Sequence, residues 1–125
     1  MGHHARVAPI VEPPNSVLLV VGREEFTPPS TFGAQSCVAT HDCVAIGVAS
    51  VDDAAISVDF AAAVARDDLQ RLGRFPLETE GMLSVRDVYN REYDAAGVTP
   101  GRVLLTVWGN DAQEPSEILL EIREA

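Results

Sequence analysis

The sequence predicts a mainly β protein: a single-domain antiparallel β-sandwich or barrel-like fold of about seven or eight short strands, with at most one short helix. Three observations predict it. Short runs rich in Val, Ile and Leu alternate with Gly, Pro and Asp along the chain. The run AISVDF, residues 55–60, alternates apolar and polar residues with period two, which is typical of a half-buried strand. A length of 125 residues suits one domain with its own core.

The first part of the chain predicts a lead-in and three strands. Residues 1–15 contain three prolines and indicate a loose lead-in, so the domain is expected to span residues 16–125. The run SVLLVV, residues 16–21, is β-branched and lies between polar segments. FTPPSTFGAQ, residues 26–35, reads as a loop because of its adjacent prolines. CVAT and CVAIGVAS then predict strands on either side of a turn at His41–Asp42.

The middle of the chain predicts one hairpin and leaves the structure of one segment open. Residues 43–50 and 55–60 are expected to form a β-hairpin around the turn VDDA. Residues 61–73 have roughly helical spacing of Val64, Leu69 and Leu72, but the Asp67–Asp68 pair interrupts them. A helical turn or two and an irregular connection both fit that segment.

The last third predicts four strands. FPLETEG and MLSVRDVYN, residues 75–81 and 82–90, read as two short strands broken at Glu80–Gly81. Neither side of the second run is cleanly apolar, which indicates a strand near a sheet edge. EYDAAGVTPGR reads as a turn-rich connector, and residues 103–109 and 117–124 predict the two final strands.

The charge balance limits the classes of partner that the protein is expected to bind. Nineteen acidic residues stand against nine arginines and no lysine, for a net charge of −10. Such a surface repels phosphate backbones and anionic lipids, so direct nucleic-acid binding and membrane binding are not expected. No apolar run approaches the ~20 residues of a membrane helix, and the N-terminus lacks the features of a secretory signal. We therefore expect a cytoplasmic protein whose charge suits a basic partner.

The stretch CVATHDC contains both cysteines, Cys37 and Cys43, together with His41. Structural zinc needs four ligands, and no second Cys or His cluster follows, so no metal is expected. A continuous strand would hold the thiols roughly 20 Å apart, whereas a hairpin tip would bring them opposite each other. A catalytic thiol needs a separate base and an orienting group. Small buried thiols in a strand are the favoured interpretation, with a disulfide left open.

The candidate partner-binding residues are acidic and lie on the last loop and strand. They are Asp111, Glu114, Glu117, Glu121 and Glu124. Glu117 and Glu121 share one face of a strand by period two. The alternative is that these acids form the ordinary solvated face of an edge strand.

The second half of the chain resembles the competence protein J family, which includes an inhibitor of the competence DNA-entry nuclease. The resemblance covers roughly residues 35–124 and lies in turn and strand residues: Gly81, the pair Pro100–Gly101, Trp108 and the acids of 114–117. CVAIGVASVDDAAISVDF is similar to the strand pair that precedes them. The resemblance implies a β-sandwich without a catalytic motif and, in the characterised members, inhibition of a nuclease by direct binding.

Together these observations predict a non-enzymatic acidic binding protein, a nuclease-inhibitor or immunity-like module, without a cofactor. Two alternatives remain: a small-ligand-binding β domain, and a thiol-based enzyme or redox sensor using Cys37 or Cys43 with His41. A homo-oligomer formed through an edge strand is also compatible with the pattern.

Overall fold

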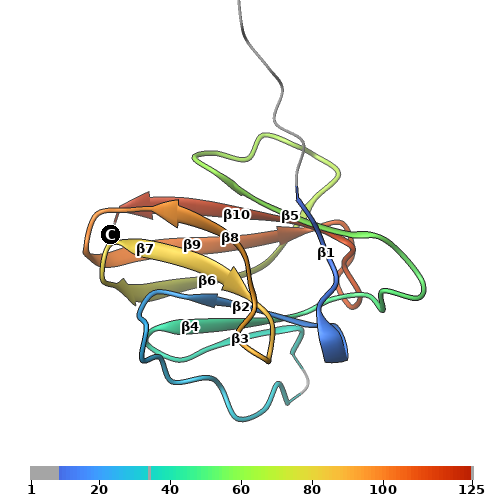
Figure 1. The fold of residues 1–125 in the computed structure, drawn as a ribbon. Coiled ribbons are helices and arrows are strands. Elements are labelled where there is room, and N and C mark those ends of the chain that lie inside the picture. Colours follow the sequence, from blue (N-terminus) through green and yellow to red (C-terminus); the bar gives the residue numbers. More distant parts are fainter. Residues whose placement is uncertain (1–8, 34, 125) are drawn as a thin grey trace, which may run out of the picture.

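The computed structural model describes residues 9–33 and 35–124 and has two five-stranded sheets packed against each other (Figure 1). Sheet A has the order β1 (Ile10–Val11), β5 (Ile56–Ala61), β10 (Glu117–Glu124), β9 (Gly101–Gly109) and β6 (Gln70–Thr79). Sheet B has the order β3 (Cys37–Ala39), β4 (Cys43–Gly47), β2 (Val17–Val21), β7 (Met82–Arg86) and β8 (Glu92–Gly97). The predicted β-sandwich is confirmed.

The core lies between the two sheets and is almost entirely aliphatic. Every second residue along each strand points into it. Sheet A contributes Ile56, Val58, Leu77, Leu105, Val107, Ile118 and Leu120, and sheet B contributes Leu18, Val20, Val44, Ile46, Leu83 and Val85. Within the described residues the helical content is one short 3-10 turn, η1 (Pro14–Ser16), and no helix is long and apolar enough to cross a membrane.

The N-terminal lead-in predicted for residues 1–15 has two parts. Residues 1–8, including the neighbouring histidines, lie outside the described residues. Ile10–Val11 forms β1, which pairs antiparallel with β5, and Val11 is buried in the core. The second part of the lead-in therefore contributes directly to sheet A.

The hairpin predicted from residues 43–50 and 55–60 is wrong, because β4 belongs to sheet B and β5 to sheet A. After β4, the N–H of Val48 donates to Ser16 O and the N–H of Ala49 donates to Pro115 O, so the chain leaves sheet B at this point. β5 then pairs parallel with β10, placing Val58 beside Ile118. Local turn chemistry did not reveal this crossing because both runs are apolar enough to lie in either sheet.

Two further segments differ from expectation or resolve an open choice. Residues 61–73 contain no helix: β5 ends at Ala61 and β6 begins at Gln70. The segment expected to be a connector, EYDAAG, is instead strand β8, paired antiparallel with β7. Alanine and acidic residues have low strand propensity, so the segment did not have the pattern of a strand. Pairing with β7 stabilises it as one.

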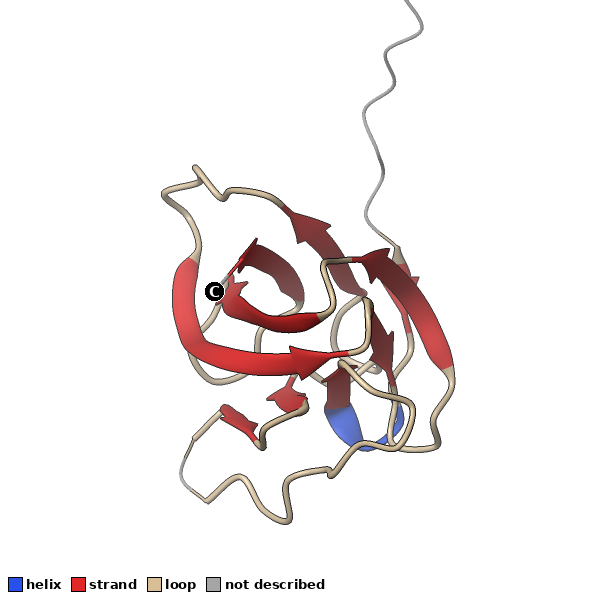
Figure 2. Ribbon diagram, turned by 90° about the vertical axis from the view of Figure 1, so that its left-hand side faces the viewer, coloured by secondary structure: helices blue, strands red, loops and turns tan. Residues whose placement is uncertain are grey.

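The predicted break at Glu80–Gly81 is confirmed, and the chain changes sheets there. Gly81 has φ +120°, a conformation that favours glycine. Around this turn the N–H of Glu78 donates to His41 O at 2.8 Å, and the N–H of Glu80 donates to Gly22 O at 2.9 Å. These bonds join the end of β6 to sheet B, which makes this side of the sandwich barrel-like (Figure 2).

The two outer faces of the sandwich differ. Residues 22–33, here called the cover loop, run across the outer face of sheet B and form the blue-to-cyan segment at the bottom of Figure 1. Phe26 and Phe32 of this loop pack on the apolar outer residues of β2 and β4, which are Leu19, Val21, Cys43 and Ala45. On the outer face of sheet A, Arg66 of the connection between β5 and β6 pairs with Glu117 of β10.

Candidate functional site

The five acidic residues expected to bind a partner do not form one exposed patch. Asp111 and Glu114 lie on the exposed loop between β9 and β10, where the Asp111 carboxylate accepts the N–H groups of Gln113 and Glu114. These two bonds lower the pKa of Asp111. Asp111 therefore already serves to fix its own loop.

The other three predicted acids have partners within the domain. Glu117 forms an ion pair with Arg66, and this bond lowers the pKa of the Glu117 carboxyl. Glu124 accepts a hydrogen bond of 2.8 Å from Thr99. Glu117 and Glu121 do share the outer face of β10, as the period predicts, but Glu121 is only 4% exposed.

Glu121 is the centre of a polar network on the outer face of sheet A. Its Oε1 accepts the indole N–H of Trp108 at 3.0 Å, and its Oε2 pairs with Arg123 at 3.0 Å. On the neighbouring strand, Arg74 Nε donates to Thr106 Oγ1 at 3.1 Å. These bonds satisfy the polar groups of this part of the sheet face.

The stretch CVATHDC forms a hairpin between β3 and β4, as one of the expected alternatives had it. Cys37 belongs to the central core, whereas Cys43 belongs to the apolar cluster under the cover loop, so the two thiols lie on opposite faces of sheet B. Both cysteines are free. Opposite faces of one sheet exclude a disulfide between these thiols in this fold.

The chemistry of the two thiols is set by burial. Burial raises the pKa of Cys37 to about 12, and burial together with the charge of Asp42 raises that of Cys43 to about 12. His41 Nε2 lies 3.3 Å from Asp42 Oδ2 and 3.8 Å from Glu78 Oε2, at the exposed tip of the hairpin. Among the described residues, no group of three Cys, His, Asp or Glu side chains could hold a metal ion.

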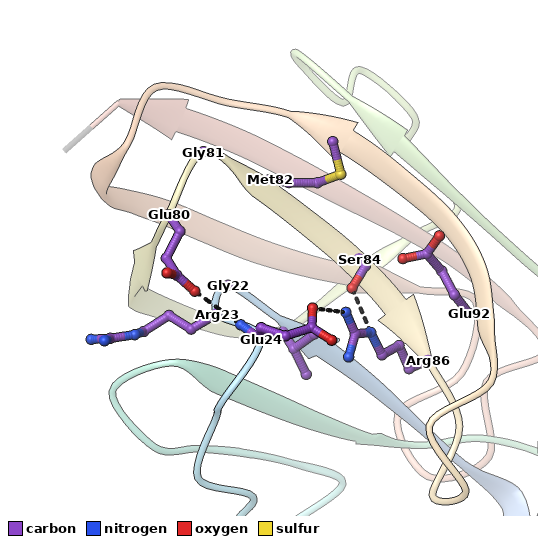
Figure 3. Close-up of a pocket in the computed structure, with 10 residues that line it drawn as sticks. Gly22, Arg23, Glu24, Glu80, Gly81, Met82, Ser84, Arg86 and Glu92 are labelled. Atoms are coloured by element: carbon purple, nitrogen blue, oxygen red, sulfur yellow. Dashed lines mark hydrogen bonds and ion pairs between the residues drawn. The ribbon is translucent and has the colours of Figure 1, made fainter.

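A pocket of about 500 Å³ lies where the end of β2, the β6–β7 turn and the start of β8 meet. Three acidic residues from these separate segments line it: Glu24, Glu80 and Glu92. We call this site the acidic pocket (Figure 3). Glycine is required at position 22, because a Cβ there would lie 2.0 Å from the carbonyl oxygen of Glu78. This close approach places Glu24 beside Glu80.

Hydrogen bonds fix the wall of the acidic pocket. The N–H of Glu24 donates to Glu80 Oε1 at 3.0 Å. Arg86, which is 9% exposed, donates from Nε to Ser84 Oγ at 2.8 Å and from Nη2 to Glu24 Oε2 at 3.2 Å. The Arg86 guanidinium also lies 6.0 Å from the centre of the Phe26 ring. Arg86 is therefore held in place and balances the charge of Glu24.

The charge left in the acidic pocket is negative. Glu24 is the ion-pair partner of Arg86 among the described residues, and Arg23 extends away from the other side chains in Figure 3. Among the described residues, Glu80 and Glu92 form no ion pair, although Glu92 lies opposite Arg86 across β7 and β8. Met82 adds an apolar group at this site and is 53% exposed. The arrangement suits a cationic group with an apolar stem.

Sequence reasoning did not single out these residues, although two features pointed to them. Acidic residues stand next to turn glycines in GREE and ETEG, at the ends of β2 and β6. The polar side of MLSVR was read as a sign of a strand near a sheet edge, and β7 lies beside the edge strand β8 in sheet B. The polar residues Ser84 and Arg86 of β7 line the acidic pocket.

Comparisons with known protein families, with curated proteins and with solved structures gave no match for this chain. The resemblance to the competence protein J family therefore stays a prediction. The structural features that bear on function are the acidic pocket and the outer faces of the two sheets.

Proposed function

We propose that this protein is a non-enzymatic binding module that docks a basic protein partner at the acidic pocket. The observation that carries the proposal is the meeting of Glu24, Glu80 and Glu92 from three separate segments beside the exposed Met82. Glu92 lies opposite Arg86, at the far end of β7 from Glu80, so the two acids would take separate basic side chains (Figure 3). A lysine or arginine side chain of the partner would place its cation at Glu80. Its methylene stem would then pack on the Met82 side chain.

The net charge of −10 supports the same proposal. A negative field around the whole domain speeds the encounter with a basic protein, whereas the pocket gives that encounter a defined contact. The class of partner that we propose is a basic nuclease or toxin-like protein, because its phosphate-binding cleft presents clustered Arg and Lys side chains. The resemblance described for residues 35–124 points to the same partner class. Two free cysteines agree with a cytoplasmic location.

The thiol-based alternative has weaker support. A nucleophilic cysteine requires a thiolate, and burial raises the pKa of both thiols to about 12, which leaves almost none of it at neutral pH. A homo-oligomer through an edge strand stays a prediction; β3 and β8 are the two edge strands of sheet B where such pairing could occur.

The test uses three forms of the protein with a deca-arginine peptide as the basic probe. The first is the native chain, and the second carries Glu24→Gln, Glu80→Gln and Glu92→Gln. The third, the matched control, carries Asp111→Asn, Glu114→Gln and Glu124→Gln, which remove the same charge from the predicted acidic residues. We expect calorimetric titration at about 50 mM salt to show binding weakened by about tenfold in the pocket variant and by about twofold in the control.

The comparison of the two triple variants decides the location. Equal losses in both would mean that only net charge attracts the probe, and a larger loss in the control would move the site to the last loop and strand. Bait experiments with the same three proteins then address the partner. A basic nuclease retained by the native chain and the control, but released by the pocket variant, is the expected result.

A further inference from the structure

The outer face of sheet A presents arginines, although the protein as a whole is acidic. Val103, Leu105 and Val107 of β9 lie in the core, so the residues between them point outward. Pairing of β9 with β6 and β10 places the outward residues of these strands in four rows across the face. The rows are Arg71, Trp108 and Leu119; Arg74, Thr106 and Glu121; Pro76, Leu104 and Arg123; and Glu78 with Arg102. Each row therefore contains one arginine.

The spacing of the rows matches that of an extended peptide. Successive rows are two residues apart along β9, which corresponds to about 6.7 Å, and the same distance separates alternate side chains of any extended chain. Arg71 and Arg74 lie on β6, on one side of β9, and Arg123 lies on β10, on the other. Arg102 belongs to β9 itself. A peptide that follows β9 would therefore meet an arginine at every second residue.

The guanidinium groups of these arginines have donors to spare. All four residues are exposed, and Arg71 and Arg102 form no ion pair or side-chain hydrogen bond within the part of the chain that the structure describes. Arg74 uses Nε for Thr106, and Arg123 uses Nε and Nη2 for Glu121. Each of these two therefore retains at least one Nη group without a partner among the described residues. Because their bonds already restrict both side chains, binding costs them less conformational entropy.

The acids on this face do not cancel the arginines. Glu121 is buried and is paired with Arg123. Glu78 lies opposite Arg102 in the fourth row and forms no ion pair with it. The rows thus hold four arginines and two acids, which gives a local net charge of +2 on a domain whose net charge is −10.

We propose that the outer face of sheet A docks an extended acidic segment of a protein partner, with Asp or Glu at alternate positions. Arginine binds a carboxylate through two parallel N–H bonds, and clusters of arginine are a recurrent means of recognising acidic motifs. Every second side chain of the segment would place its carboxylate at one row. This interaction is separate from the acidic pocket and uses a partner surface of the opposite charge.

A nucleic acid fits this face less well than an acidic peptide does. Single strands bind proteins by stacking successive bases on several aromatic side chains, and Trp108 is the one aromatic residue in the four rows. The net charge of −10 also repels a phosphate backbone that continues beyond the rows. A short acidic segment matches a positive charge that is limited to this face.

The test titrates the native protein with a ten-residue peptide in which Glu and Ser alternate, and with its counterpart in which Gln replaces Glu. Backbone amide shifts are followed at about 150 mM salt, where a Debye length of about 8 Å screens the long-range repulsion between the peptide and the acidic domain. We expect the Glu peptide to give saturable shifts on β6, β9 and β10 and to change the emission of Trp108. The Gln peptide should give neither.

Two double variants locate the interaction. Arg71→Gln with Arg102→Gln removes two arginines that no described side chain uses, and we expect binding of the Glu peptide to weaken by about tenfold. The matched control, Arg23→Gln with Arg91→Gln, removes the same charge from exposed residues outside sheet A and should weaken binding by less than about twofold. The amide spectrum and the thermal unfolding of each variant confirm that it is folded.

Some outcomes would overturn the proposal. Shifts that are absent from β6, β9 and β10, or equal binding of the Glu and Gln peptides, would show that this face does not recognise carboxylates. Equal losses in the two double variants would mean that the position of the arginines does not matter. Tighter binding of a ten-nucleotide single strand of DNA than of the Glu peptide would assign the face to nucleic acid instead.

Discussion

The outer faces of sheet A and sheet B are stabilised by different kinds of side-chain contact. Outward side chains of β9 and β10 include Trp108, Glu121 and Arg123, which satisfy one another by hydrogen bonds and an ion pair. Outward side chains of β2 and β4 are apolar and are covered by Phe26 and Phe32. One face is stabilised by polar side chains, and the other by a second apolar layer.

The difference shows where a pocket can arise in a small sandwich. A polar network fills its own space with hydrogen bonds and leaves little apolar surface to bind. A loop laid over an apolar face packs less completely than a strand, because its backbone must also satisfy its own polar groups. An apolar groove of about 270 Å³ between the cover loop and Leu19 and Ala45 lies on the sheet B side, as does the acidic pocket at the start of that loop.

The largest expected effect concerns the polar face. Glu121→Ala removes the buried acceptor of the Trp108 indole and of Arg123, so we expect the free energy of unfolding to fall by about 3 kcal/mol. Denaturant unfolding followed by the fluorescence of the single Trp108 measures it. Glu121→Gln, which keeps one acceptor for the indole, should lose less. Equal losses in the two variants would show that the network is not what stabilises this face.

The next effect concerns the attachment of the cover loop. Asp42→Ala removes the acceptor of the Thr27 N–H and of the Thr40 hydroxyl, and we expect a loss of about 2 kcal/mol. Limited proteolysis should then cut within residues 22–33 faster than in the native chain. Asp42→Asn keeps an acceptor oxygen and is the control. A native-like cleavage rate in Asp42→Ala would mean that phenylalanine packing alone holds the loop.

A smaller effect on stability comes from ionisation of the two buried thiols, Cys37 in the central core and Cys43 under the cover loop. Their folded-state pKa values are raised from 9.0 to about 12, so the unfolded chain loses these protons first as the pH rises. Stability is therefore complete below about pH 9 and falls above it, by about 1.4 kcal/mol per thiol at about pH 10. The raised pKa of Tyr93 acts in the same direction at still higher pH.

The check on this prediction is the pH dependence of unfolding in a Cys37→Ala, Cys43→Ala double variant. Its stability should fall less steeply than that of the native chain between about pH 9 and pH 11. An unchanged slope would mean that the thiols ionise over the same pH range in the folded and unfolded protein, so that burial does not raise their pKa. That result would restore the case for a reactive cysteine.

The smallest expected effect is a difference between the labelling rates of the two thiols. Cys43 lies under the cover loop and Cys37 in the central core, so opening of the loop alone should expose only Cys43. We expect thiol labelling under native conditions to modify Cys43 about fivefold faster than Cys37, and Asp42→Ala to widen that ratio. Mass spectrometry of the labelled peptides gives both rates. Equal rates would indicate that the thiols become accessible only through global unfolding.

The fold class was predictable because period-two alternation directly reflects burial on one face of a strand. In the last strand, Ile118 and Leu120 are two positions apart, and both are fully buried. The neighbours of each strand were not predictable: β4 and β5 are consecutive apolar runs, yet they lie in different sheets. Alternation specifies which side of a strand is buried but not which strand lies beside it.

The site was less predictable than the fold. Glu121 looked like an exposed acid because it alternates with apolar residues, but the Trp108 indole on the paired strand covers and binds it. Glu24, Glu80 and Glu92 are separated by up to 68 positions, and only the turn at Gly81 and the close approach at Gly22 bring them to one pocket. No local pattern marks such a meeting.

By itself, the sequence determined the mainly β character, the aliphatic core, the negative charge and the turn between the two cysteines. These properties depend on the composition and spacing of neighbouring residues, which the chain carries locally. The tertiary structure alone decided that the thiols of CVATHDC face opposite layers, that MLSVR lies inside a sheet, and that the cover loop packs on the outer face of sheet B. Each of these follows from pairing between distant strands, where the free energy of burying apolar surface selects the arrangement.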